Sequence, residues 1–151
     1  MTPRFNHIAM SVPADLLDAP GRADLLAFWG GVFGFAELPT ETVDRGKLVL
    51  QAYDWEQFVF LIAEDEPMQA PRLDHFGMSV ETKEELDLFL ARATAFQEHD
   101  GRVEIIGPGM EEHAGALRLH SFYVRFLLPL MLEVQWFDWD PEVAALNPGR
   151  R

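Results

Sequence analysis

Polar and apolar residues alternate along two similar stretches of the chain. The first is Asn6–Val12 (NHIAMSV) and the second is Asp74–Val80 (DHFGMSV). A period of two is typical of a strand with one buried face. The stretches share a histidine, a methionine, a serine and a valine at equivalent positions, about half a chain apart. We therefore predict an internal duplication of one module that opens with a histidine-bearing strand.

The rest of the chain fits this duplication, because each opening strand is followed by a helical pattern and then by β-type runs. Thr82 and Glu85 have the spacing of a capping box at the start of the second helix. The predicted helices are 23–33, ending near Gly34, and 82–98; the predicted strands after them are 47–53 and 57–63, then 102–106, 117–126 and 130–137. Prolines and glycines predict loops over 13–21 and 108–115.

This order predicts an α+β fold. Two βαβββ modules would pair into one curved, eight-stranded, cup-like mixed sheet with helices outside. We expect a single domain over 1–151, with module 1 at about 4–64, a linker at about 64–72, module 2 at about 73–139 and a loose tail at 140–151.

Composition narrows the classes of function. The net charge of −13 argues against nucleic acid or an anionic membrane as a partner. It fits a solvated acidic surface or, alternatively, a groove for a cationic ligand. The chain has no cysteine and, as we interpret it, no membrane span and no room for a signal peptide, so we expect a cytoplasmic protein.

Three residues are candidate metal ligands. In the opening strands, alternation places His7 and His75 on faces with small neighbours, opposite the bulky apolar residues. Glu133 stands in the apolar run LMLEVQWF, where an ionised carboxylate is costly unless it is paired or bound to a cation. Two imidazoles and a carboxylate suit one divalent metal, with Fe²⁺ favoured and Mn²⁺, Ni²⁺ or Zn²⁺ as alternatives. A vestigial, metal-free pocket is the other interpretation.

At these residues the chain resembles the vicinal oxygen chelate superfamily, which includes glyoxalase I, extradiol dioxygenases and bleomycin- and fosfomycin-resistance proteins. The resemblance extends from Phe5 to about Trp139 and lies in NHIAMSV, DHFGMSV and SFYVRF…LMLEVQWFDW. It implies metal ligands at His7, His75 and Glu133. It also implies a small-molecule substrate and a homodimer.

The stretch from His113 to Phe137 is most similar to extradiol dioxygenases. That similarity implies that Tyr123 and His113 bind a substrate oxygen and carry protons. Two departures stand out. The strand 56–61 lacks the histidine of the dioxygenases, and only Glu56 or Gln57 could replace the carboxylate that glyoxalase I has there. We take Gln57 as a candidate catalytic residue, although only one of the two can face inward.

We therefore expect a metal-dependent enzyme, with extradiol-dioxygenase-like ring cleavage of a catechol-type substrate placed first. A glyoxalase I-like isomerase or epimerase with Ni²⁺ or Zn²⁺ is the alternative, and a metal-free drug-binding or resistance protein is a further one. Fosfomycin-type thiol transfer ranks low, because a phosphonate needs a basic pocket and the local run supplies only Arg118 and Arg125. The apolar turn Phe126–Pro129 is predicted to be an oligomer contact or a lid.

Overall fold

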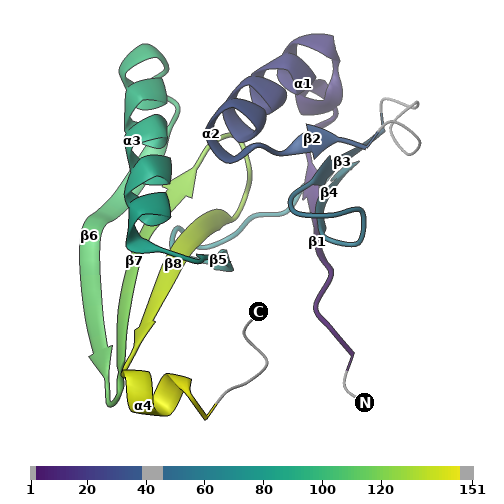
Figure 1. The fold of residues 1–151 in the computed structure, drawn as a ribbon. Helices are drawn as coiled ribbons and strands as arrows, with labels where there is room; N and C mark the ends of the chain where they lie inside the picture. Colours follow the sequence, from purple (N-terminus) through teal and green to yellow (C-terminus); the bar gives the residue numbers. More distant parts are fainter. Residues whose placement is uncertain (1–2, 39–45, 147–151) are drawn as a thin grey trace.

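A computed structural model describes residues 3–38 and 46–146. Its eight strands form two separate four-stranded mixed sheets (Figure 1). In the first sheet the order is β1-β4-β3-β2, with β1 His7–Val12, β2 Ala36–Glu37, β3 Lys47–Gln51 and β4 Phe58–Ala63. In the second it is β5-β8-β7-β6, with β5 His75–Val80, β6 Glu104–Ala114, β7 Leu117–Arg125 and β8 Met131–Trp139. In both sheets the opening strand runs parallel to the last strand of its module.

Each module places its helical segment between its first two strands. In module 1 these are a 3₁₀ turn (Ala14–Leu17), α1 (Ala19–Leu25), a π-helical stretch (Leu26–Gly30) and α2 (Gly31–Phe33); in module 2 there is α3 (Lys83–His99). The predicted loop over 13–21 is therefore wrong, since most of it is helical. The predicted end at Gly34 is confirmed, because this glycine has φ 77° in the left-handed region.

The predicted α+β fold with two modules is confirmed, but within the described chain the two sheets do not join into one eight-stranded sheet. The helices of the two modules pack against each other (Figure 1), with ring centroids 5.1 Å apart for Phe28–Phe96 and 5.4 Å for Phe33–Phe89. Since the modules meet through their helices, the edge strands β1 and β5 are not paired with each other.

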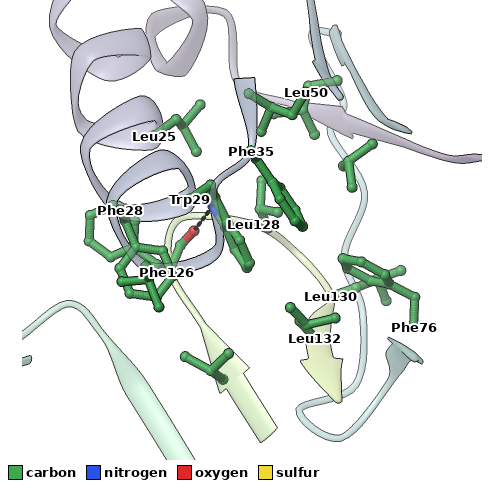
Figure 2. Close-up of a cluster of buried hydrophobic side chains, with 14 of the residues drawn as sticks. Leu25, Phe28, Trp29, Phe35, Leu50, Phe76, Phe126, Leu128, Leu130 and Leu132 are labelled. Atoms are coloured by element: carbon green, nitrogen blue, oxygen red, sulfur yellow. Dashed lines mark hydrogen bonds between the residues drawn. The ribbon is translucent and has the colours of Figure 1, made fainter. Parts of the chain in front are cut away.

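One hydrophobic core spans both modules (Figure 2). Trp29 and Phe126 are fully buried, and the Trp29 indole N–H donates to the Phe126 carbonyl at 3.3 Å. The turn that we predicted to be an oligomer contact or a lid therefore belongs to this core, because Phe126 and Leu128 are buried against module 1. Leu127 takes up the strain of the turn at φ 59°.

Two further sequence predictions change in the last third of the chain. The predicted loop 108–115 is wrong, since most of it is the second half of β6. The register of β6 against β7 shifts between Ile106 and Met110, and Gly107 and Gly109 in this stretch have φ 63° and 79°. The glycines thus mark a β-bulge and not a loop. In the predicted loose tail, Pro141–Ala144 forms α4, capped by Asp140, while residues 147–151 lie outside the described residues.

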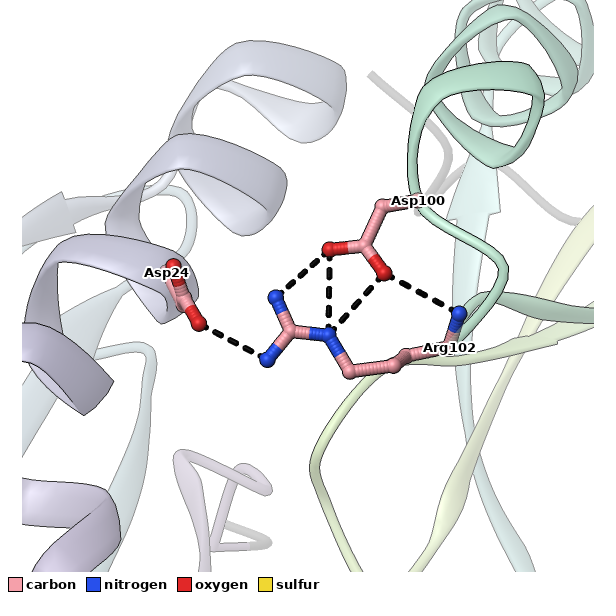
Figure 3. A network of polar contacts seen from close by, with 3 residues as sticks. All are labelled: Asp24, Asp100 and Arg102. Carbon is pink, nitrogen blue, oxygen red and sulfur yellow. Dashed lines mark hydrogen bonds and ion pairs between the residues drawn. The ribbon is translucent and has the colours of Figure 1, made fainter.

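Figure 3 shows an ion-pair network that crosses between the modules. Arg102, after α3, pairs with Asp24 of α1 at 2.8 Å and with Asp100 at 2.6 Å. These pairs raise the pKa of Arg102 above its ordinary value and lower the pKa of Asp100. Among the helices in the described ranges, none has the length and apolar character needed to cross a bilayer.

Candidate metal centre

Both histidines of the repeat lie on the open faces of their sheets. In β1, Met10 and Val12 point into the core while His7 is exposed. In β5, Phe76 is buried while His75 is exposed. The two faces assigned from alternation in the sequence are therefore confirmed.

On the open face of module 2, His75, Glu133 and Tyr123 meet. The His75 Nε2 atom lies 3.3 Å from Glu133 Oε2, and Glu133 is only 6% exposed. Tyr123 is the cross-strand partner of Glu133 and donates a hydrogen bond to its carboxylate. The Tyr123 ring also lies edge-on to the His75 ring, with centroids 5.0 Å apart. Burial, the hydrogen bond to Glu133 and the charges of Glu133 and Glu112 raise the pKa of Tyr123 to about 12.

The surroundings of His75 indicate which of its two ring nitrogens carries the hydrogen. Its Nδ1 atom lies 2.8 Å from the Leu73 carbonyl oxygen, which can only accept, so Nδ1 carries the hydrogen. A neutral His75 then has a lone pair on Nε2, 3.3 Å from a carboxylate oxygen. Two acceptor atoms this close need a proton or a cation between them. A backbone carbonyl behind Nδ1 is also the usual support of a metal-binding histidine, so these two residues fit a metal ion.

His7 has the same tautomer but a different environment. Its Nδ1 atom lies 2.9 Å from Asn6 Oδ1, and its ring stacks on Phe58 at 4.9 Å with an interplanar angle of 6°. His7 belongs to the other sheet, and in residues 3–38 and 46–146 no three His, Asp or Glu side chains lie close enough to hold a metal together. One chain thus brings together His75 and Glu133 but not His7.

The other two predicted residues lie away from Tyr123. Gln57 is exposed, precedes β4 and, with His7, lines a cavity of about 440 Å³. Its alternative, Glu56, is ion-paired to Arg4 at 3.1 Å. His113 lies in β6 on the sheet face opposite Tyr123, with Nε2 2.9 Å from Glu111 Oε1.

Sequence reasoning missed several polar side chains on the Tyr123 face. Ser121 is 3% exposed and pairs across the strands with Gln135, one step from Tyr123 and Glu133. Their alternation with Tyr123 and Glu133 is visible in the sequence and could have revealed them. Glu112 also lies on this face, because it is two residues from Met110, the cross-strand partner of Ser121. The register shift in β6, which the sequence does not reveal, changes its partner in β7 but not its face.

Comparisons with known proteins give structural neighbours only. No family model matches the chain, and no curated protein matches it. The fosfomycin resistance protein FosX of Listeria monocytogenes is 16% identical, with a TM-score of 0.62 over 100% of both chains. A mutant FosX complexed with Mn(II) and 1S,2S-dihydroxypropylphosphonic acid is 17% identical, with a TM-score of 0.59 over 96% of this chain and 99% of that one.

An integron cassette protein from V. cholerae is also similar, at 18% identity and a TM-score of 0.53 over 91% of this chain and 98% of that one. Identities this low establish the fold alone. The repeated βαβββ architecture inferred from the two histidine strands is thereby confirmed, and the chain has the fold of the vicinal oxygen chelate superfamily.

Proposed function

We propose that the protein is a metal-dependent enzyme that acts on a small molecule. One divalent metal would be held by His7, His75 and Glu133. The observation that carries the proposal is the pair His75 and Glu133, whose Nε2 and Oε2 atoms lie 3.3 Å apart while Nδ1 is tied to the Leu73 carbonyl. A buried carboxylate and a nitrogen lone pair at this distance need a cation or a proton between them.

We propose that the protein works as a homodimer and that the third ligand, His7, comes from a second copy. Within the described chain β1 is paired only with β4, and β5 only with β8. Among the described residues, His7 does not gather with His75 and Glu133 into a three-ligand group, which supports a third ligand from a second copy. A two-fold dimer would then form two equivalent sites.

His7, His75 and Glu133 would hold the metal and leave positions open for two adjacent substrate oxygens, and the chemistry that the metal would supply is Lewis-acid polarisation of those oxygens. FosX was crystallised with Mn(II) and a dihydroxy phosphonate, which supports a divalent metal with an oxygen-rich ligand. We place Fe²⁺ first and Mn²⁺, Ni²⁺ or Zn²⁺ after it. The proposed reaction is extradiol-dioxygenase-like ring cleavage of a catechol-type substrate.

The residues around the ligands would position the substrate. The hydrogen bond from Tyr123 holds the Glu133 carboxylate in one orientation. Tyr123 has a single hydroxyl hydrogen, so to carry a proton to a substrate oxygen this hydrogen would have to turn from Glu133 to the substrate when the substrate binds. His113 has no access to this face within one chain, so its predicted role stays a prediction.

Two alternatives have weaker support from local charges. A glyoxalase-like isomerase needs a carboxylate base, and the side chain of Glu56 is 75% exposed and paired with Arg4. A phosphonate substrate needs a cation, and Arg125, on the same strand face as Tyr123, is paired with Glu104. Metal analysis distinguishes the third alternative, a metal-free binding protein, from the proposed metalloenzyme.

Calorimetric titration of the apoprotein with each of the four metals tests the proposal. We expect one metal per chain in the wild type, loss of binding in His75→Ala, and unchanged binding in His99→Ala at the end of α3. After anaerobic loading with Fe²⁺, catechols in air should cause O₂ uptake. Absence of stoichiometric metal binding in the wild type, or undiminished binding in His75→Ala, would refute the metalloenzyme.

Mixing two inactive variants tests the second copy. If the ligands come from two chains, a refolded mixture of His7→Ala and His75→Ala recovers about a quarter of the wild-type metal sites, because half of the dimers are mixed and each has one intact site. If one chain supplies all three ligands, every site in the mixture has a lesion and nothing is recovered.

A further inference from the structure

A second cavity, of about 360 Å³, lies where the end of β1 and the segment that joins the modules pass close to the start of β6 and the end of β7. His7, His75, Glu133 and Tyr123 are not among the described residues that line it. The cavity therefore includes none of the proposed metal ligands. Its volume lies within the range of small-molecule sites.

Two guanidinium groups share one carboxylate at this cavity. Glu104, at the start of β6, accepts a hydrogen bond from Arg72 at 2.6 Å and another from Arg125. Glu104 and Arg125 both line the cavity, and the Arg125 side chain is only 28% exposed. The group has two positive charges and one negative charge, whereas the chain as a whole carries −13. An excess positive charge that is largely shielded from water attracts an anion more strongly than an exposed one.

The two arginines of the lining differ in the number of nitrogens that are already bonded. All three guanidinium nitrogens of Arg102 donate to Asp24 or Asp100 (Figure 3), so its charge is balanced. Arg125 donates through Nη2 to Glu104, and its Nε and Nη1 atoms have no partner among the described residues. Guanidinium N–H groups form strong, charge-assisted hydrogen bonds with carboxylates. Arg125 is therefore the group of this cavity that can bind an anion.

The rest of the cavity wall is mainly aliphatic. Its apolar residues are Val12, Pro13, Pro67, Met68, Leu127, Leu128 and Pro129. No aromatic side chain lines it within the described ranges. An aliphatic group gains free energy when it leaves water for such a wall, and a flexible methionine adapts to its shape. The cavity thus combines one anion-binding group with an aliphatic surface.

We propose that this cavity binds a small aliphatic monocarboxylate. The carboxylate accepts hydrogen bonds from Nε and Nη1 of Arg125, and the aliphatic chain lies against Met68, Leu127 and Pro129. A single negative charge matches the one excess positive charge, whereas a phosphate dianion would bring a further negative charge close to Glu104. The site is additional to the proposed metal centre, because it uses none of the metal ligands.

Four probes test the proposal by NMR titration of the full chain: hexanoate, acetate, 1-hexanol and inorganic phosphate. We expect hexanoate to bind at least about 10-fold more tightly than 1-hexanol, which lacks the charge, and than acetate, which lacks the chain. Phosphate should bind more weakly than hexanoate. The Arg125 Nε–H and Met68 methyl resonances, assigned by their absence in Arg125→Gln and Met68→Leu, should shift with hexanoate. Removal of metal by dialysis should leave the affinity for hexanoate unchanged.

Two matched pairs of substitutions place the site. Arg125→Gln should weaken hexanoate binding about 10-fold, whereas Arg118→Gln, in the same strand but outside the lining, should leave it unchanged. Glu104→Gln removes the competing carboxylate and should strengthen hexanoate binding at least about 3-fold. Asp138→Asn, which removes the carboxylate paired with Arg118, should have no effect. Glu104→Gln also tests the site if Arg125→Gln does not fold.

Several results would overturn the proposal. They are no binding of hexanoate, equal affinity for hexanoate and either 1-hexanol or acetate, and tighter binding of phosphate than of hexanoate. Equal weakening by the two arginine variants, weaker binding in Glu104→Gln, or loss of hexanoate binding with the metal would also overturn it.

Discussion

The open faces of the two sheets differ in the strand that pairs with the repeated histidine strand. In module 1, Ala9 pairs with Phe60. In module 2, the equivalent Gly77 pairs with Glu133. One position in the same architecture thus holds a phenylalanine in one module and a carboxylate in the other.

The next step along the strands shows the same difference. Ser11 pairs with Ile62 in module 1, and Ser79 pairs with Gln135 in module 2. The duplicated strand therefore supplies a histidine to both faces, while the last strand of each module determines whether that face is apolar or polar. The comparison teaches that the two modules are equivalent in backbone but not in chemistry, so the carboxylate of module 2 can be replaced by the residue of module 1 as a test.

The largest effect is expected from making module 2 resemble module 1. Glu133→Phe copies the residue at the equivalent position of module 1 and should abolish stoichiometric metal binding, because it removes the carboxylate. Glu133→Gln, similar in shape, should also bind no metal. Calorimetry measures both, with Glu112→Gln on the same face and Phe60→Leu as controls that keep binding. Metal binding by Glu133→Phe would place the site elsewhere.

The second effect concerns the contact between the modules. Trp29→Ala should destabilise the protein by about 3–5 kcal/mol, because it empties a fully buried site and removes the indole hydrogen bond to Phe126. Trp29→Phe, which keeps a ring, should cost less. Urea unfolding followed by far-UV circular dichroism should show one transition in each variant. Two separated transitions in Trp29→Ala would mean that the modules fold independently.

Local patterns in the sequence predicted most elements of the modules. The alternation of His7 and His75 gave the correct faces, and Thr82 with Glu85 gave the start of α3, where the Glu85 N–H donates to Thr82 Oγ1 at 3.2 Å. These features depend on neighbours within a few residues. The sequence therefore contains the information directly.

The arrangement of the modules depends on distant contacts, which a single sequence does not reveal. The apolar turn around Phe126 looked exposed because its partner, Trp29, lies 97 positions earlier. His113 was assigned to a loop because the glycines of the bulge looked like a loop signal. In β6 it pairs with Arg118, on the opposite face from Tyr123. His7 lies on a different sheet from His75 and Glu133, and the modules that carry these sheets meet through their helices.

A smaller effect is expected within module 2 from Glu104. Burial raises its pKa, but hydrogen bonds from Arg72, at 2.6 Å, and from Arg125 outweigh burial and lower the pKa below the ordinary 4.5. The resulting stabilisation is fully present above that ordinary value and is lost as the pH falls through the folded-state pKa. The difference in unfolding free energy between wild type and Glu104→Gln should therefore shrink on acidification below about pH 5. If the difference in unfolding free energy between wild type and Glu104→Gln did not change with pH, the ion pairs of Glu104 with Arg72 and Arg125 would not be its source.

The smallest effect is expected from the ion pairs that join the modules (Figure 3). Arg102→Gln removes the pairs with Asp24 and Asp100, but half of the Arg102 side chain is exposed, so water and salt already weaken them. The loss of stability should be below about 1 kcal/mol and should decrease further in high salt. Arg102 also lies over the Phe126 ring at 5.2 Å, and any loss that persists in high salt is assigned to that contact. Thermal unfolding at two salt concentrations separates the two contributions. Because Trp29 and Phe126 join the same modules through buried contacts, a loss as large as that of Trp29→Ala would show that charge, and not the apolar core, holds the modules together.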